Sequence, residues 1–216
     1  MRTQKKHFDS FHFLLSLLSF NLLLIVIALL WGYGKNELAM KFEEYGFITT
    51  FSFIQLFITG LISFFTYLKR KKLIWILVAL GFVFLSLDEK FLIHEQLDTM
   101  LHELFNMKET ALSDRIDDFL ILGYGLIGLV FLIRFRTEFL RHKTGVAMLS
   151  LGFGVMVLSV IFDTLGNSNT WDDIFSGRIP SAALHQLGIV VEESLKITAE
   201  AFLLSGFYAY LCYYRK

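Results

Sequence analysis

Residues 188–207 read GIVVEESLKITAEAFLLSGF, an apolar helical pattern that carries Glu192, Glu193, Lys196 and Glu200. An ionisable side chain inside a hydrocarbon layer costs free energy, so such residues almost always face the interior of a helix bundle or a water-filled cavity. At 100° per residue, these four groups fall within an arc of roughly 100°. The stretch therefore predicts a helix of a membrane-embedded bundle whose polar stripe is turned inward.

The whole chain has the composition of a helical membrane protein. Of its 216 residues, 55% are hydrophobic and only 19% are charged, which is too apolar for an ordinary soluble domain. Long apolar runs alternate with short charged stretches, and a spanning helix needs about 20 such residues. We therefore predict an all-α fold, a polytopic six-transmembrane-helix bundle forming a single domain (1–216), with spans near 11–32, 46–68, 73–96, 117–136, 144–164 and 184–213.

Basic residues set the expected orientation. Clusters of Lys and Arg precede the first span (5–6), join spans two and three (69–72), join spans four and five (134–143) and end the chain (215–216). These connections alternate along the chain, so they fall on one side, which the positive-inside rule makes cytoplasmic. We expect a multi-pass protein of the bacterial inner (plasma) membrane with both termini in the cytoplasm.

The same clusters bear on partners. Because they are explained as topology signals, they give no support for nucleic-acid binding, whereas membrane lipid is an expected partner that they can also contact. A homo-oligomer is an open alternative to a monomer. The single cysteine, Cys212, excludes an internal disulfide and a thiolate metal cluster.

A second group of ionisable residues stands where span three ends. Residues 85–103 read LSLDEKFLIHEQLDTMLHE. A spacing of seven places Asp88, Glu95 and His102 on one face of a continuous helix. A series at i, i+4 and i+8 runs from His94 to His102, a spacing by which a helix can present metal ligands together.

The predicted orientation brings these groups to one depth. It places them in the outer third of the membrane, together with residues 192–200, Asp163 at the end of span five and His185 near the start of span six. Apolar residues at helical spacing predict that span three continues into an amphipathic outer helix over 97–116. We expect the acids to meet around one outward-opening cavity roofed by this helix.

The balance of charge in the stripe needs a physical explanation. Lys196 can form a salt bridge with Glu193 or with Glu200, at i, i−3 or i, i+4 spacing. One lysine cannot neutralise three carboxylates, so the surplus must be met by protons, a cation or buried hydrogen-bond donors.

Two functions fit clustered carboxylates with a few imidazoles. The first is a membrane-embedded hydrolase that activates water on zinc; the alternative is a divalent-cation or proton channel or transporter. Oxygen-rich sites prefer calcium, magnesium or manganese, and imidazole shifts the preference to zinc. The candidate catalytic residues are Glu192, Glu193 and Lys196, and the candidate metal ligands are Asp88, His94, Glu95, His102, Asp163, His185 and Glu200.

The pentapeptide EESLK, residues 192–196, carries a resemblance to a known family. It looks like the E-E-x-x-K element of PrsW-type intramembrane proteases, relatives of the CAAX-processing group. The resemblance implies a polytopic membrane metalloprotease fold, with Glu192 and Glu193 at the active centre and Lys196 beside them. That family carries further motifs on later helices, whereas here the one H-x-x-x-D match, His94 and Asp98, precedes EESLK.

Overall fold

The computed structural model describes the chain apart from residues 1, 36, 44–45, 106–115, 167–180 and 216, and it also leaves undescribed the side chains of 2–9, 116–119, 163–166 and 181–184. The described residues form helices and contain no strand, which confirms the all-α prediction. The helices are α1 (Arg2–Tyr33), α2 (Phe47–Arg70), α3 (Leu73–Phe91), α4 (Ile93–Phe105), α5 (Ile116–Arg134), α6 (Arg136–Phe139), α7 (Lys143–Gly166) and α9 (Ser181–Tyr213).

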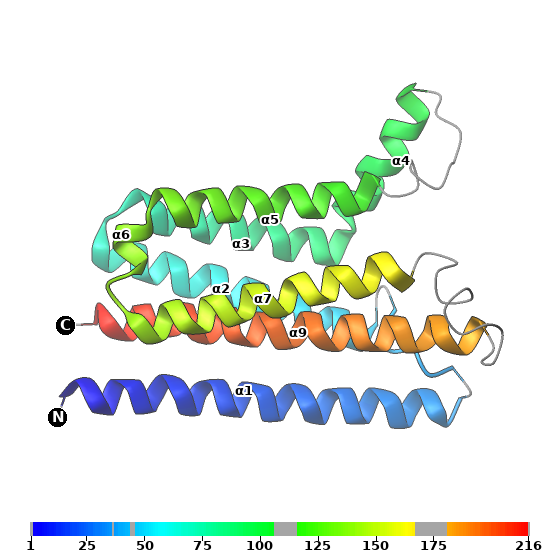
Figure 1. Cartoon of the computed structure of the whole chain (residues 1–216), viewed down its shortest axis with the longest axis horizontal. Helices are drawn as coiled ribbons and strands as arrows, with labels where there is room; N and C mark the ends of the chain where they lie inside the picture. Colours follow the sequence, from blue (N-terminus) through cyan, green and yellow to red (C-terminus); the bar gives the residue numbers. More distant parts are fainter. Residues whose placement is uncertain (1, 36, 44–45, 106–115, 167–180, 216) are drawn as a thin grey trace.

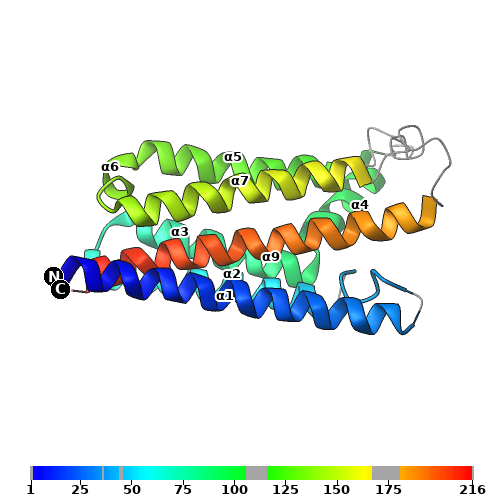
Figure 2. The same cartoon turned by 60° about the horizontal axis from the view of Figure 1, so that its bottom comes forward.

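The long helices run side by side along one axis, as Figures 1 and 2 show. Both chain ends, the turn between α2 and α3, and α6 lie at one end of the bundle, called here the inner end. The helix α4 and the connection from α1 to α2 lie at the opposite, outer end. Helix α9 packs against α7, α2 and α1, so the stretch that carries EESLK runs through the middle of the molecule.

Three helical stretches are long and apolar enough to cross a membrane. They are Ser10–Tyr33, Phe47–Arg70 and Lys143–Phe162, with mean hydropathies of 2.8, 1.8 and 2.3. Leu120–Arg134 is apolar but shorter. Helices α3 and α9 are 19 and 33 residues long, and both carry several ionisable residues. These ionisable residues distinguish α3 and α9 from the three apolar stretches. Whether α3 and α9 can lie in a membrane therefore depends on whether their ionisable side chains point into the bundle.

The chain breaks between α3 and α4, which changes one expectation. Leu92 adopts a left-handed conformation with φ of 51°, so α3 does not continue through residue 96. Asp88 stabilises the break, because its Oδ1 accepts the backbone N–H of His94, 2.9 Å away, in the first turn of α4. The prediction that Asp88, Glu95 and His102 share one face required a continuous helix, and that condition is not met.

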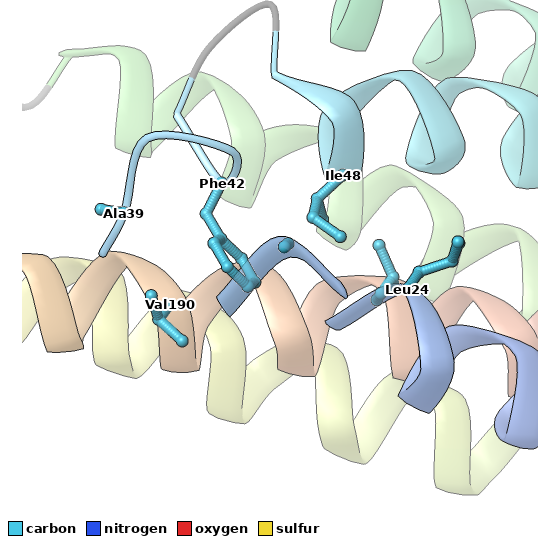
Figure 3. Packing of buried hydrophobic residues seen from close by; sticks show 7 residues of the cluster. Leu24, Ala39, Phe42, Ile48 and Val190 are labelled. Carbon is cyan, nitrogen blue, oxygen red and sulfur yellow. The ribbon is translucent and has the colours of Figure 1, made fainter. Parts of the chain in front are cut away.

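Two apolar clusters hold α9 in place. At the outer end, Ala39 and Phe42 of the α1–α2 connection pack with Leu24, Ile48 and Val190 (Figure 3). At the inner end, Trp75 of α3 is fully buried against aromatic rings of α6 and α9, namely Phe139, Phe207 and Tyr210, at 5.3–6.3 Å between ring centroids.

Helices α7 and α9 approach each other closely through two glycines. A Cβ atom on Gly152 would lie 2.9 Å from Leu203, and one on Gly206 would lie 2.9 Å from Leu149. Small residues allow such close helix packing in membranes. The two apolar clusters and the close packing of α7 against α9 hold α9 along its length. Its polar section, Glu193 to Glu200, lies between the two clusters.

Candidate functional site: a buried carboxylate cluster with one lysine

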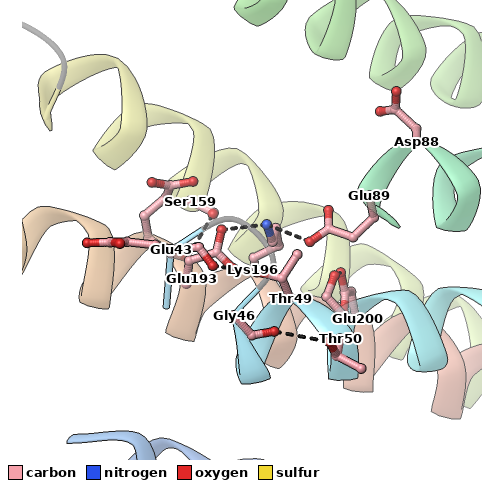
Figure 4. Close-up of polar contacts among 12 residues, drawn as sticks. Glu43, Gly46, Thr49, Thr50, Asp88, Glu89, Ser159, Glu193, Lys196 and Glu200 are labelled. Atoms are coloured by element: carbon pink, nitrogen blue, oxygen red, sulfur yellow. Dashed lines mark hydrogen bonds and ion pairs between the residues drawn. The ribbon is translucent and has the colours of Figure 1, made fainter. Parts of the chain in front are cut away.

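The polar section of α9 is turned into the bundle, as the stripe predicted. Only 8% of Glu193 and 1% of Glu200 are exposed to solvent. Figure 4 shows that the section faces α2 and the end of α3. Glu89 lies sixteen residues beyond Leu73 at the inner end of α3, or about 24 Å at 1.5 Å per residue. The cluster therefore lies far from the inner end of the bundle.

Lys196 joins two helices through two carboxylates. Its Nζ lies 2.5 Å from Oε1 of Glu193, one turn earlier on α9, and 2.9 Å from Oε1 of Glu89 on α3. Of the two partners that the sequence left open, Glu193 rather than Glu200 forms the salt bridge. Glu89 was not among the predicted site residues, although its place beside Asp88 at the end of a span was a usable signal.

Glu200 occupies the deepest position of the cluster. It follows Lys196 by one turn, about 6 Å along the helix. Its Oε1 accepts a hydrogen bond from Ser52 Oγ of α2, 2.5 Å away. Its Oε2 is buried and has no hydrogen-bond partner among the described residues. A buried acceptor in this state is costly unless it carries a proton or binds a cation.

The electrostatics of the cluster are unbalanced toward negative charge. Glu89, Glu193 and Glu200 share one ammonium group, and Oε2 of Glu193 also has no hydrogen-bond partner among the described residues. Glu192 is close enough to Lys196 to add to the attraction that Lys196 feels. Carboxylates this close together and this buried cannot all be ionised without compensation by a proton, a cation or a further hydrogen-bond donor.

Asp88 belongs to a separate polar group at the outer end. Its side chain points away from Lys196, as Figure 4 shows, and its Oδ2 lies 3.0 Å from Nδ1 of His94. His94 Nε2 in turn lies 3.8 Å from Oε1 of Glu95. His102 pairs with Asp98 within α4, at 3.0 Å. The predicted histidine series thus forms two neighbouring acid–imidazole pairs rather than one ligand set.

The other predicted site residues lie in different environments. Glu192 is half-buried, and its backbone carbonyl accepts a hydrogen bond from Ser159 Oγ of α7 at 3.0 Å. His185 is exposed. The side chain of Asp163 and residues 106–115 of segment 97–116 lie outside the described residues. Within the described part of the chain, no three His, Cys, Asp or Glu side chains are grouped so that they could hold a metal ion.

Further buried polar side chains of α1 and α2 lie beside the cluster and between it and the inner end. Asn21 of α1 donates to the backbone carbonyl of Ile197 at 2.8 Å, and Gln55 of α2 donates to Oδ1 of Asn21 at 3.2 Å. The buried face of α2 is lined along its length by polar residues, namely Thr49, Ser52, Gln55, Thr59, Ser63 and Thr66. The sequence carried a usable signal for this face, because its polar residues recur every three or four positions.

Comparison with known proteins gives one family. The model of the Domain of unknown function (DUF8692) family matches residues 12–211. The chain belongs to this family. No match was found among curated proteins or among solved structures. The DUF8692 match covers the part of the chain that holds the carboxylate cluster and both acid–imidazole pairs.

Proposed function

We propose that this DUF8692 protein is a six-span protein of the bacterial inner membrane that carries protons through its carboxylate cluster. The support for six spans is the alternation of basic connections, together with the common end at which both termini, the α2–α3 turn and α6 lie. Reporter fusions after Met40, Arg70, Leu140 and Lys216 test this topology. An external signal after Arg70 or Lys216 overturns it.

One observation carries the functional proposal: the buried carboxylate of Glu200 has one oxygen bonded to Ser52 and one oxygen without a partner among the described residues. Such a group is suited to bind and release a proton, because neither state is locked by a second donor. Of the ions that the sequence leaves open, the geometry favours protons. The Lys196 ammonium already lies between Glu89 and Glu193, where a divalent cation would otherwise bind.

The proposal takes the polar face of α2 as the path from the cluster toward the inner end. Thr59, Ser63 and Thr66 of α2 each donate a hydrogen bond to the carbonyl four residues earlier, at 2.8–2.9 Å. Their oxygen lone pairs remain able to accept, so a file of water along this face would find acceptors at each turn. In this proposal protons enter past Glu89 and Glu193, occupy Glu200, and leave along α2.

Proton flux in liposomes tests the proposal. The full chain is reconstituted with a trapped pH-sensitive dye, and a potassium gradient with valinomycin drives proton entry. We expect measurable flux in the wild type and a loss of about 100-fold in Glu200→Gln, the order of effect of removing a proton-transferring group. Glu103→Gln, an exposed acid on α4, is the matched control. Equal flux in Glu200→Gln and wild type overturns the proposal.

A metal-dependent hydrolase is the second candidate, and the Asp88–His94 pair favours it. A carboxylate that orients an imidazole is the usual support of a histidine metal ligand, and Glu95 lies beside the pair. The described residues do not bring together the three ligands that a zinc ion needs; with a further ligand, zinc would supply activated water. Stoichiometric zinc in purified protein that is lost in Asp88→Asn, together with no proton flux, would favour hydrolysis over transport.

A further inference from the structure

A cleft opens at the inner end of the bundle between α5, α6 and α7. Its volume is about 260 Å³. Its walls are mostly apolar, with Leu132 from α5, Phe139 from α6, and Leu149 and Phe153 from α7. The carboxylate cluster lies elsewhere, on the α2, α3 and α9 side of the molecule. This cleft therefore needs its own explanation.

One rim of the cleft is positively charged. Arg136 lines it and is exposed, and the guanidinium makes no ion pair or hydrogen bond with any other described residue. Arg134 and Lys143 are exposed on the same connection. The nearby acid, Glu138, is buried and is already held by Arg70 and by Arg141. The rim thus presents positive charge that is not neutralised by the described part of the chain.

The lining of the cleft indicates what fills it. Its walls are mostly apolar, and one exposed arginine lies at the rim. A hydrocarbon chain that ends in an anionic group is complementary to both features. Basic pockets between helices on the cytoplasmic side are suited to anionic lipid headgroups.

We infer that this cleft binds one anionic phospholipid, with an acyl chain against Leu132, Leu149 and Phe153 and the phosphate against Arg136. The inference rests on the membrane placement proposed above, and it does not depend on proton transport. A guanidinium and a phosphate form charge-assisted hydrogen bonds, and the exposed hydroxyl of Ser150 on the cleft wall adds a donor near the headgroup.

Native mass spectrometry of the full chain in detergent tests this site. Phosphatidylglycerol and phosphatidylcholine are added at equal concentration, and the retained lipid is counted. We expect the wild type to retain phosphatidylglycerol preferentially and Arg136→Gln to retain about fivefold less, the effect of one basic residue near a lipid surface. Ser150→Phe, which fills the cleft, should lower retention of both lipids. Lys72→Gln, an exposed basic residue on the α2–α3 turn and away from the cleft rim, is the matched control.

Several outcomes overturn the inference. They are equal retention of the two lipids by the wild type, unchanged retention in Arg136→Gln and Ser150→Phe, or an equal loss in Lys72→Gln. Protection from heat by inorganic phosphate as strong as that by phosphatidylglycerol would make it a phosphate site instead. A dimer that forms in the wild type and is lost in Ser150→Phe would assign the cleft to a second copy. Because lipid retention is read without ion flux, its failure is distinguishable from failure of the proposed transport.

Discussion

Each end of the bundle holds a buried carboxylate, and the two are compensated in opposite ways. At the inner end, Glu138 accepts two hydrogen bonds from Arg70, at 2.8 and 3.1 Å. Trp75 Nε1 approaches its Oε1 at 3.5 Å, and Arg141 lies 3.6 Å from its Oε2. Glu138 is therefore a single carboxylate with several donors around it. At the outer end, Glu89, Glu193 and Glu200 share Lys196.

The difference separates a structural cluster from a candidate functional one. Burial by itself would raise the pKa of Glu138, but the bonds from Arg70 and the neighbouring Tyr214 and Trp75 outweigh it, so the pKa is lowered. That carboxylate is held charged and joins α2, α3 and α6. The outer cluster leaves oxygens of Glu193 and Glu200 without hydrogen-bond partners among the described residues, so its protonation is free to change.

Removing the lysine should have the largest effect on stability. Lys196→Met strands Glu89 and Glu193 in a buried site, and breaking a buried pair costs roughly 3–5 kcal/mol. The double change with Glu193→Gln should recover most of this loss. Thermal unfolding in detergent measures both, with exposed Lys72→Met as the control. If Lys196→Met unfolds like the control, the ion pairs with Glu89 and Glu193 do not stabilise the fold.

The inner cluster should be next in size. Glu138→Gln keeps an acceptor but removes the charge opposite Arg70, whose side chain is 25% exposed and can reach water. We expect a loss of about 2 kcal/mol, the usual range for hydrogen bonds to charged groups, with proton flux unchanged. Thermal unfolding and the liposome assay measure the two. A flux lower than in Glu103→Gln would show that the two clusters are coupled.

The sequence predicts the general arrangement better than the partners. Apolar runs and the arc of charges on residues 192–200 indicate helices and an inward stripe, because these depend on local periodicity. The partner of Lys196 on α3 and the hydroxyl that bonds Glu200 depend on how α2, α3 and α9 pack, which periodicity does not contain. The break at Leu92 also escaped prediction, since a leucine in a left-handed conformation has no sequence signal.

The stabilising effect of Glu138 should depend on pH. Because its pKa in the folded protein is lowered from 4.5, its contribution is fully present above pH 4.5 and is lost as the pH falls through the folded pKa. The difference in unfolding free energy between wild type and Glu138→Gln should therefore shrink as pH falls from 6 toward 3, by some part of the about 2 kcal/mol expected for the replacement. A difference that stays constant or grows on acidification would contradict the charged state assigned to Glu138.

The smallest effect on stability is expected where the effect on flux is largest. Glu200→Gln keeps a carbonyl oxygen to accept the Ser52 hydrogen bond, and it removes one acid from a cluster that has too many for Lys196. We expect the unfolding free energy to change by less than about 1 kcal/mol, since no partner is stranded. Glu138→Gln is the matched replacement at the other end, where Arg70 loses its charged partner. Thermal unfolding of the two variants side by side decides between the assignments. If Glu200→Gln is as destabilising as Glu138→Gln, then Glu200 is a structural acid like Glu138, and the contrast between the two ends of the bundle is lost.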